Sequence, residues 1–211
     1  MSLFFKKHPH KRRGFSLVEL LVSVGIVTVI LSIIVLNQRS YTESTTISNL
    51  AENMSLSLSE AQAYGLAVKE ISPGTDDFTA GYGISVSMLE QGDELGFILF
   101  TDRNDSEHYD GDWSCDTGPS SECLEKVEFP EGYHIESFCV LRTTGADQCG
   151  EVRRADISFH RPNVEARMAF FNSGGNPFTT PNLKGVRITM ESPSGLTKSV
   201  VVYTTGQLSV Q

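Results

Sequence analysis

The pattern of hydrophobic and polar residues changes twice along the chain. From Phe15 to Leu36 almost every residue is apolar, and Glu19 is the only ionisable side chain. A helix rises about 1.5 Å per residue, so roughly 20 such residues cross the hydrocarbon core of a bilayer. The first region therefore predicts a single membrane-spanning helix.

From residue 37 to residue 70 the apolar residues form a stripe. They recur in steps of three and four, at Ile47, Leu50, Met54, Leu58, Ala61, Gly65 and Val68. This spacing is typical of an amphipathic helix that covers a sheet. We expect it to continue the first helix to about Lys69 and to end at Ser72-Pro73-Gly74, because Pro lacks a donor and Gly tolerates left-handed dihedral angles.

Beyond residue 71 the pattern has a period of two, as strands do. Residues 82–88 and 95–100 alternate on either side of Gln91-Gly92-Asp93 and predict an antiparallel hairpin. Further short strands are expected at residues 126–129, 133–140, 155–160, 166–171, 185–190, 198–203 and 208–210. One long helix followed by about eight strands predicts an α+β fold, with the helix on one face of antiparallel sheet.

Charge is unevenly divided between the two sides of the apolar run. Residues 1–14 hold five of the 17 Lys and Arg and none of the 26 Asp and Glu. The rest of the chain has 12 basic and 26 acidic residues, a net charge of −14 against −9 for the whole. Basic residues next to a membrane helix stay cytoplasmic, so we expect the remainder of the chain to be exported.

The residues around the start of the apolar run carry a specific motif. Gly14-Phe15-Ser16-Leu17-Val18-Glu19-Leu20-Leu21, after a basic flank, resembles the class III signal of type IV pilins and type II secretion pseudopilins. The resemblance implies that prepilin peptidase cuts after Gly14 on the cytoplasmic side and that Phe15 becomes the N-methylated terminus. It also implies that Glu19 pairs with the α-amine of a neighbouring subunit during filament assembly.

The same resemblance predicts how the chain is divided. A prepilin leader would occupy residues 1–14, and the transmembrane and filament-core helix would occupy residues 15–36. An amphipathic continuation would follow at 37–70, and an exported β-rich pilin domain at 71–211. The protein would be anchored in the cytoplasmic membrane as a single-pass protein and would then enter a pilus or pseudopilus.

Physical chemistry supports the role that the resemblance gives to Glu19. A carboxylate at the centre of a membrane helix costs about 2.5–3.5 kcal/mol on insertion scales, so Glu19 needs a partner. A methylated ammonium matches it, and the polar pair can fix the axial register, which apolar contacts in lipid specify poorly.

A looser resemblance extends into the second half of the chain. The Gly-rich hairpin, the turn Phe100-Thr101-Asp102-Arg103-Asn104 and the turn Thr205-Gly206-Gln207 resemble the FimT and H-type minor pseudopilin family. This likeness implies a minor subunit that initiates, caps or decorates a type IV pilus or type II secretion pseudopilus. Its partners would be prepilin peptidase, other pilin or pseudopilin subunits and the assembly platform. The segments 102–125 and 172–182 depart from the family pattern and leave the subtype open.

Four cysteines, Cys115, Cys123, Cys139 and Cys149, all follow the apolar run. An even number in an exported domain predicts two disulfides, with three possible connectivities. The spacings do not fit a zinc knuckle. We favour the local pairs Cys115–Cys123 and Cys139–Cys149, each contributing roughly 2–3 kcal/mol.

The most polar stretch is the segment from Asp102 to Asp112. Oxygen-bearing residues stand at the first, third, fifth and ninth places of a calcium loop: Asp102, Asn104, Ser106 and Asp110. Glu107 replaces the turn glycine, and the twelfth place has no Glu. The segment is therefore either a weak calcium site or a solvated acidic loop.

Neither an enzyme nor a nucleic-acid-binding protein is indicated. His108, His134 and His160 stand in unrelated contexts, each expected in a surface or loop position, and no Gly-x-Ser-x-Gly elbow is present. Four arginines could form a cluster for phosphate, namely Arg153, Arg154, Arg161 and Arg167, but a net charge of −14 repels a polyanion. The alternative function, a filament-tip module for DNA or a surface ligand, would need that cluster.

Overall fold

The computed structural model describes residues 14–67, 80–116, 118 and 121–211. The chain divides after Tyr41 into two compact units, and the second unit is Thr42–Gln211. The predicted leader up to residue 13, Lys69 and the predicted helix end at Ser72-Pro73-Gly74 lie outside the described residues.

Helix α1 begins at Leu17 and ends at Leu66, so it contributes to both units. In the first unit, Leu17–Val35 has a mean hydropathy of 2.7 and none of it is buried. By length and composition this segment can cross a membrane. Its hydroxyl groups are satisfied within the helix, since Thr28 and Ser32 each donate to the carbonyl oxygen four residues earlier.

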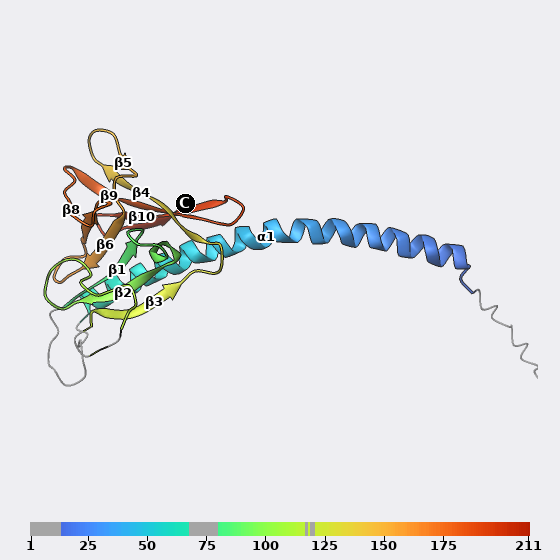
Figure 1. The fold of residues 1–211 in the computed structure, drawn as a ribbon, viewed down its shortest axis with the longest axis horizontal. Coiled ribbons are helices and arrows are strands. Elements are labelled where there is room, and N and C mark those ends of the chain that lie inside the picture. The colour runs from blue at the N-terminus through green and yellow to red at the C-terminus, as the bar shows by residue number, and fades with distance from the viewer. Residues whose placement is uncertain (1–13, 68–79, 117, 119–120) are drawn as a thin grey trace, which may run out of the picture. The chain divides into compact units, whose positions relative to one another are not determined.

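The second unit contains two antiparallel sheets (Figure 1). The order in the first sheet is β3 (Cys123–Glu128), β2 (Gly96–Asp102), β1 (Gly81–Ser87), β6 (Arg154–Phe159), β7 (Ala166–Phe171) and β8 (Pro177–Phe178). The order in the second sheet is β11 (Leu208–Val210), β10 (Thr197–Tyr203), β9 (Leu183–Glu191), β4 (His134–Arg142) and β5 (Gln148–Cys149). A short 3₁₀ helix, η1 (Asp93–Leu95), lies between β1 and β2. The predicted α+β fold, with a long helix and antiparallel sheets, is confirmed.

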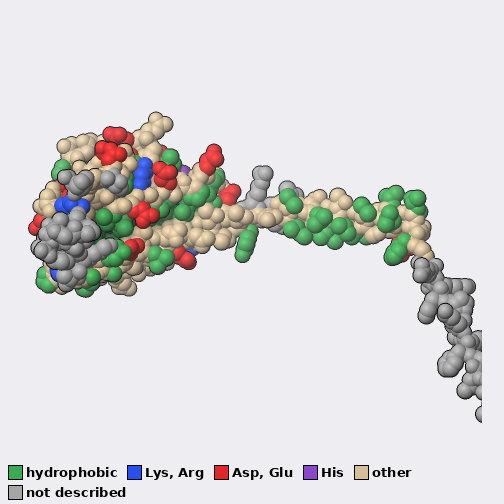
Figure 2. Space-filling model, turned by 90° about the horizontal axis from the view of Figure 1, so that it is seen from below, with side chains coloured by type: hydrophobic (Ala, Val, Ile, Leu, Met, Phe, Trp, Pro, Cys, Tyr) green, Lys and Arg blue, Asp and Glu red, His purple; other side chains and the backbone are tan. Residues whose placement is uncertain are grey.

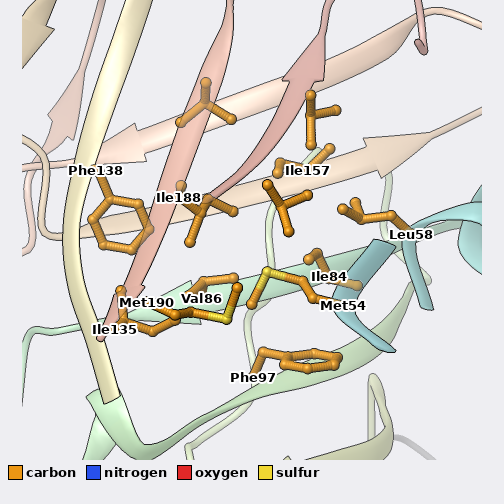
Figure 3. Close-up of a cluster of buried hydrophobic side chains, with 14 of the residues drawn as sticks. Met54, Leu58, Ile84, Val86, Phe97, Ile135, Phe138, Ile157, Ile188 and Met190 are labelled. Carbon is orange, nitrogen blue, oxygen red and sulfur yellow. The ribbon is translucent and has the colours of Figure 1, made fainter. Parts of the chain in front are cut away.

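The apolar stripe of α1 packs into one core with residues of both sheets. Met54, Leu58 and Ala61 on the helix are fully buried. They belong to one cluster with Ile84 of β1 and Ile188 of β9, and Figure 3 shows most of these side chains converging. The three-and-four spacing of the sequence thus identifies the helix face that the sheets cover.

The end of α1 approaches the first sheet closely. A Cβ atom added to Gly65 would lie 2.3 Å from the carbonyl oxygen of Phe159, so only glycine fits there. Three residues earlier, the amide of Gln62 donates to the carbonyl oxygens of Val164 and Gly206 at 3.3 and 3.2 Å. These contacts fix how this turn of the helix sits on the second unit's sheets.

The strands differ from the sequence-based expectation mainly where they are shortest. The predicted hairpin is β1 and β2, with Gly81 opposite Asp102. Strand β3 begins at Cys123, before the predicted start at residue 126. Its first residues do not alternate between apolar and polar, so the sequence pattern did not include them. Strands β5 and β8 have two residues each, which is too few for a period of two to appear in sequence.

We predict that Gly65→Ala destabilises the second unit by about 1–3 kcal/mol, because the added methyl group meets backbone that cannot move away. Urea unfolding of the fragment 42–211 measures the change. Ser59→Ala, at an exposed position of the same helix, is the control and should alter stability by less than about 0.5 kcal/mol. Equal stability of the two variants would contradict the close packing at Gly65.

Candidate functional site

The first candidate site is the N-terminal half of α1. Phe15 is 80% exposed, and every large apolar side chain from Leu17 to Val35 is more than half exposed. Figure 2 shows these side chains on the surface of the helix. Glu19 lies in the first turn of α1, so the described residues place it among apolar side chains that require cover from lipid or from other helices.

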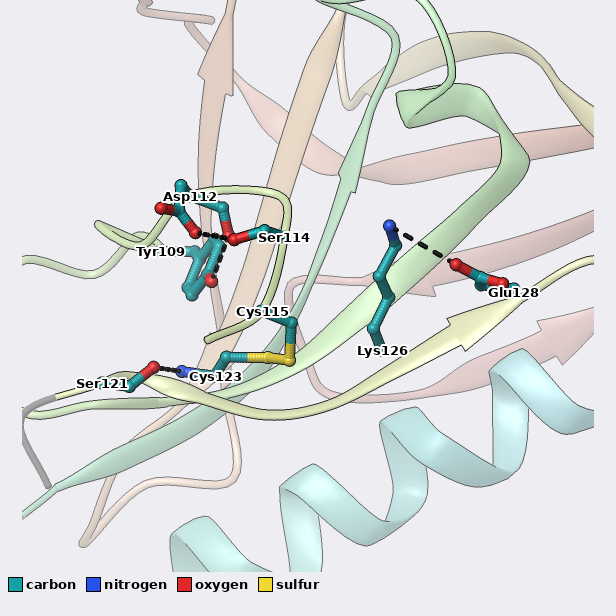
Figure 4. Close-up of a disulfide and its surroundings, with 8 residues drawn as sticks. All are labelled: Tyr109, Asp112, Ser114, Cys115, Ser121, Cys123, Lys126 and Glu128. Carbon is teal, nitrogen blue, oxygen red and sulfur yellow. Dashed lines mark hydrogen bonds and ion pairs between the residues drawn. A yellow bond between two sulfur atoms is a disulfide. The ribbon is translucent and has the colours of Figure 1, made fainter. Parts of the chain in front are cut away.

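The cysteines form two disulfides, Cys115–Cys123 and Cys139–Cys149, and the described residues include no free cysteine. The second links residues that face each other across β4 and β5. The first links the segment between β2 and β3 to the start of β3 (Figure 4). We call residues 103–122, which connect β2 to β3, the polar loop; the disulfide closes its second part.

Within the polar loop, the oxygen atoms of the expected calcium ligands make hydrogen bonds to the loop itself. The Asp102 carboxylate, at the end of β2, accepts the backbone N–H groups of Ser106 and Glu107 at 3.0 and 2.7 Å. The Asn104 amide donates to Asp110 at 2.7 Å, and the Ser106 hydroxyl donates to the His108 carbonyl oxygen at 2.9 Å. Calcium binding by Asp102, Asn104, Ser106 and Asp110 stays a prediction.

Asp102 also contacts His160, which lies in a loop position directly after β6 but is buried rather than at the surface. His160 is only 6% exposed, and its Nε2 lies 3.4 Å from the Asp102 Oδ2. Burial is the largest influence on the pKa of Asp102 and raises it. The hydrogen bonds from His160, Glu107 and Ser106 together outweigh burial, so the pKa lies below the ordinary value for Asp.

A second buried carboxylate, Asp156 of β6, attaches the polar loop to the sheet. It accepts the Ser85 hydroxyl at 2.6 Å, the Tyr109 backbone N–H at 3.0 Å and Arg154 Nε at 3.0 Å. The Arg154 guanidinium also lies over the Phe171 ring, 4.7 Å from its centre. Asp156 is completely buried, and this network supplies the partners that a buried charge needs.

Two further loop residues have shifted pKa values. Burial, and then the nearby Asp112 and Glu122 charges, raise the pKa of Tyr109 to about 12, so the neutral hydroxyl donates to the Asp112 carbonyl oxygen (Figure 4). Burial raises the pKa of Glu122 as well, although the N–H groups of Asp110 and Arg103 favour its charged form.

The sequence pattern did not predict the roles of Asp156 and Glu122. Asp156 and Ser158 alternate with apolar residues along β6, and this alternation predicts that both side chains face solvent. The polar residue Ser85 on the neighbouring strand β1 was the signal that could have indicated a buried polar contact at Asp156. The two residues lie opposite each other, so their polar side chains meet on one face of the sheet. Glu122 had no such signal, because its partners are backbone groups of a loop.

The four arginines do not form a free cationic cluster. Arg154 pairs with Asp156, and Arg167 Nη1 lies 2.8 Å from Glu107 and 3.7 Å from Asp105. Two of the four expected phosphate contacts are therefore already engaged by carboxylates.

Comparison with known proteins bears on the first candidate site. Residues 9–35 match the family model described as the prokaryotic N-terminal methylation motif. Together with the uncovered apolar helix, this match indicates a type IV pilin-like protein, a structural class rather than a catalytic one. The motif implies processing by prepilin peptidase and anchoring in the inner membrane with pilin subunits. No curated protein and no solved structure matches the chain.

We predict that Asp156→Asn lowers the free energy of unfolding by about 3 kcal/mol, because it leaves the partly buried Arg154 without its counter-charge. Chemical unfolding of the fragment 42–211 measures this. Glu128→Gln is the control, since the Lys126–Glu128 pair spans 3.6 Å at the surface and should contribute less than about 1 kcal/mol. A loss at Asp156 no larger than the loss at Glu128 would refute the anchoring role.

A further prediction concerns the stability of the fold at low pH. Because the folded-state pKa of Asp102 is lowered, its contribution to stability is present above the unfolded-state value of about 3.9 and is lost as pH falls through the lower folded-state value. The difference in unfolding free energy between the native chain and Asp102→Asn should therefore shrink as pH falls from 6 to below about 3. Asp116→Asn, at an exposed loop position, controls for the loss of one charge. A difference that stays constant with pH would contradict the prediction.

Proposed function

We propose that the protein is a minor pilin or pseudopilin, which initiates, caps or decorates a type IV pilus or a type II secretion pseudopilus. The observation that carries this proposal is a methylation motif followed by an apolar helix segment, Leu17–Val35, none of which is buried. A segment of this kind requires lipid before assembly and neighbouring helices afterwards.

Assembly follows from the chemistry at the start of this helix. Cleavage after Gly14 creates a new α-amine on Phe15, four residues before Glu19. The carboxylate and the amine are each costly in an apolar bundle, and each becomes tolerable when it meets its opposite charge on a neighbouring subunit. The pair then sets the axial position of one subunit against the next.

The minor role is supported by the turns that resemble minor pseudopilins. Phe100-Thr101-Asp102-Arg103-Asn104 stands where β2 leads into the polar loop. Thr205-Gly206-Gln207 connects β10 and β11, and Gly206, with a φ of 82°, receives a hydrogen bond from Gln62 of the helix. The residues that resemble minor pseudopilins therefore lie at two turns of the backbone, one after β2 and one between β10 and β11.

The alternative, a filament-tip module for DNA or a surface ligand, has no specific observation in its favour. The arginines that would hold phosphate include Arg154 and Arg167, which face carboxylates. The charge of −14 beyond the leader also opposes a polyanion.

The experiment is a Glu19→Val substitution in cells that assemble the filament. We expect normal cleavage and membrane insertion, because valine removes an insertion cost, and incorporation reduced by about tenfold or more, because the amine loses its partner. Immunoblots of sheared filaments measure incorporation, and mass spectrometry reports whether each chain begins at methylated Phe15.

Glu52→Gln is the matched control. It removes a carboxylate from an exposed position of the same helix but outside the apolar segment, so incorporation should be unchanged. Native incorporation of Glu19→Val, or filaments that contain the chain with Met1 still in place, would overturn the proposed function.

A further inference from the structure

We propose that the hollow between residues 88–94 and 134–136 is a docking site for an arginine or lysine side chain of a partner protein. The hollow has a volume of about 410 Å³ and lies between the turn of the β1–β2 hairpin and the first residues of β4. This volume falls in the range of about 300–1,000 Å³ that is typical of ligand pockets. We call it the acidic hollow, after the glutamates that line it.

The acidic hollow carries negative charge that has no counter-charge in its lining. Glu90, Glu94 and Glu136 line it together with His134, and the described residues of the lining include no lysine and no arginine. The side chains of Glu90 and Glu136 make no ion pair and no hydrogen bond within the described part of the chain. A cationic side chain that enters the hollow would therefore find carboxylates ready to pair with it.

The rest of the lining is largely apolar. Ile135 is completely buried in the main core, Met88 packs against that core, and Leu89 is half-buried beside them. Lysine and arginine have methylene stems that pack along apolar surface while the charged end stays with its polar partners. The combination of apolar and acidic lining therefore fits the whole of such a side chain and not its charge alone.

Hydrogen bonds fix the turn that carries Glu90 and Glu94. Asp93, which is 7% exposed, accepts the Ser87 hydroxyl at 2.7 Å and the Glu90 backbone N–H at 3.1 Å. One carboxylate oxygen of Glu94 accepts the Gly92 N–H at 2.9 Å, and the other oxygen is left for a partner. The turn is thus ordered before a partner arrives, which lowers the entropic cost of binding.

A bulge in β4 places the third glutamate. The register of β4 against β9 shifts between Ile135 and Ser137, so Glu136 is an extra residue with no partner on β9. Bulges commonly redirect a side chain of the strand that contains them. Glu136 is exposed and lines the hollow, so two separate parts of the fold bring carboxylates to one place.

Two arginines lie close to the hairpin turn without neutralising the hollow. Arg154 pairs with Ser87 across the sheet, and the Arg153 carbonyl oxygen accepts the Met88 N–H at 2.7 Å. Neither of these described side chains lines the hollow, and Arg154 is already paired with Asp156. The glutamates therefore keep their negative charge for a partner.

The spacing of the carboxylates favours a side chain over a metal ion. No three of the described carboxylate and imidazole groups in the lining have ligand atoms within 4.8 Å of one another. A guanidinium group, with five N–H donors in a planar fork, reaches carboxylates that a single ion cannot gather. A second copy of the chain is a poor occupant, because chains with a net charge of −14 beyond the leader repel each other at long range. The occupant is therefore a basic segment of another protein.

The test is fluorescence anisotropy of a labelled, blocked peptide with one arginine between leucines, titrated with residues 15–211 in a non-ionic detergent, with empty micelles as the blank. Starting at Phe15 removes the five basic residues of the leader, which would compete for the hollow. An ionic strength of about 0.15 M gives a Debye length of about 8 Å, so distant charges are screened. We expect saturable binding of one peptide per chain. Citrulline in place of the arginine should weaken binding by at least about tenfold.

Two matched double variants locate the binding. Glu90→Gln/Glu136→Gln and Glu125→Gln/Glu165→Gln each remove two negative charges from exposed positions. Glu125 and Glu165 do not line the hollow, and Glu165 lies at the end of the first sheet opposite to the hairpin turn. The first variant should weaken peptide binding by at least about tenfold and the second by less than about twofold. Both should keep the native melting temperature, because all four side chains are exposed.

Three results would overturn the proposal: no saturable binding, equal binding of the arginine and citrulline peptides, or equal weakening by the two double variants. The last result would show that the field of the whole chain, rather than contact in the hollow, attracts the peptide. Self-association that only Glu90→Gln/Glu136→Gln abolishes would assign the hollow to a second copy instead. Peptide binding requires neither Glu19 nor filament assembly, so the docking site and the proposed function stand or fall separately.

Discussion

The burial of a single helical stripe against two sheets is the interaction on which the second unit depends. Met54 and Leu58 of α1 share one cluster with Ile84 from the first sheet and Ile188 from the second. Without the helix, the inward faces of both sheets would lose their common neighbour, at a cost of roughly 1.5–3 kcal/mol for each large side chain exposed. In its N-terminal segment, Leu17–Val35, the same helix has apolar side chains that none of the described residues buries.

The opposite face of the first sheet combines buried charge with a small apolar cluster of Ile98, Phe100, Tyr109 and Cys123. Asp156 accepts hydrogen bonds from three residues, Ser85, Tyr109 and Arg154, and thereby holds the polar loop against β1 and β6. The disulfide Cys115–Cys123 closes the second part of that loop and restricts the unfolded chain there. A loop rich in carboxylates can remain ordered because its most buried charges are matched.

The sequence predicted what depends on periodicity and missed what depends on contacts between distant segments. The apolar run, the helical stripe at Met54 and Leu58, and the β1–β2 hairpin follow from spacing alone. The burial of His160 could not be predicted in this way, because it requires Gly81 to lie opposite the end of β6. Asp156 was equally hidden, since one strand does not reveal which residues its neighbour presents.

The edges of the two sheets have a consequence for how copies of the chain associate. Strands β5, β8 and β11 are two or three residues long, and the fourth edge strand, β3, carries Glu125, Lys126 and Glu128. Short or charged edges are poor templates for adding a strand from another molecule, which is the usual route to unwanted β-aggregation. The sheets of the second unit are thereby protected from edge-to-edge pairing between copies of the chain.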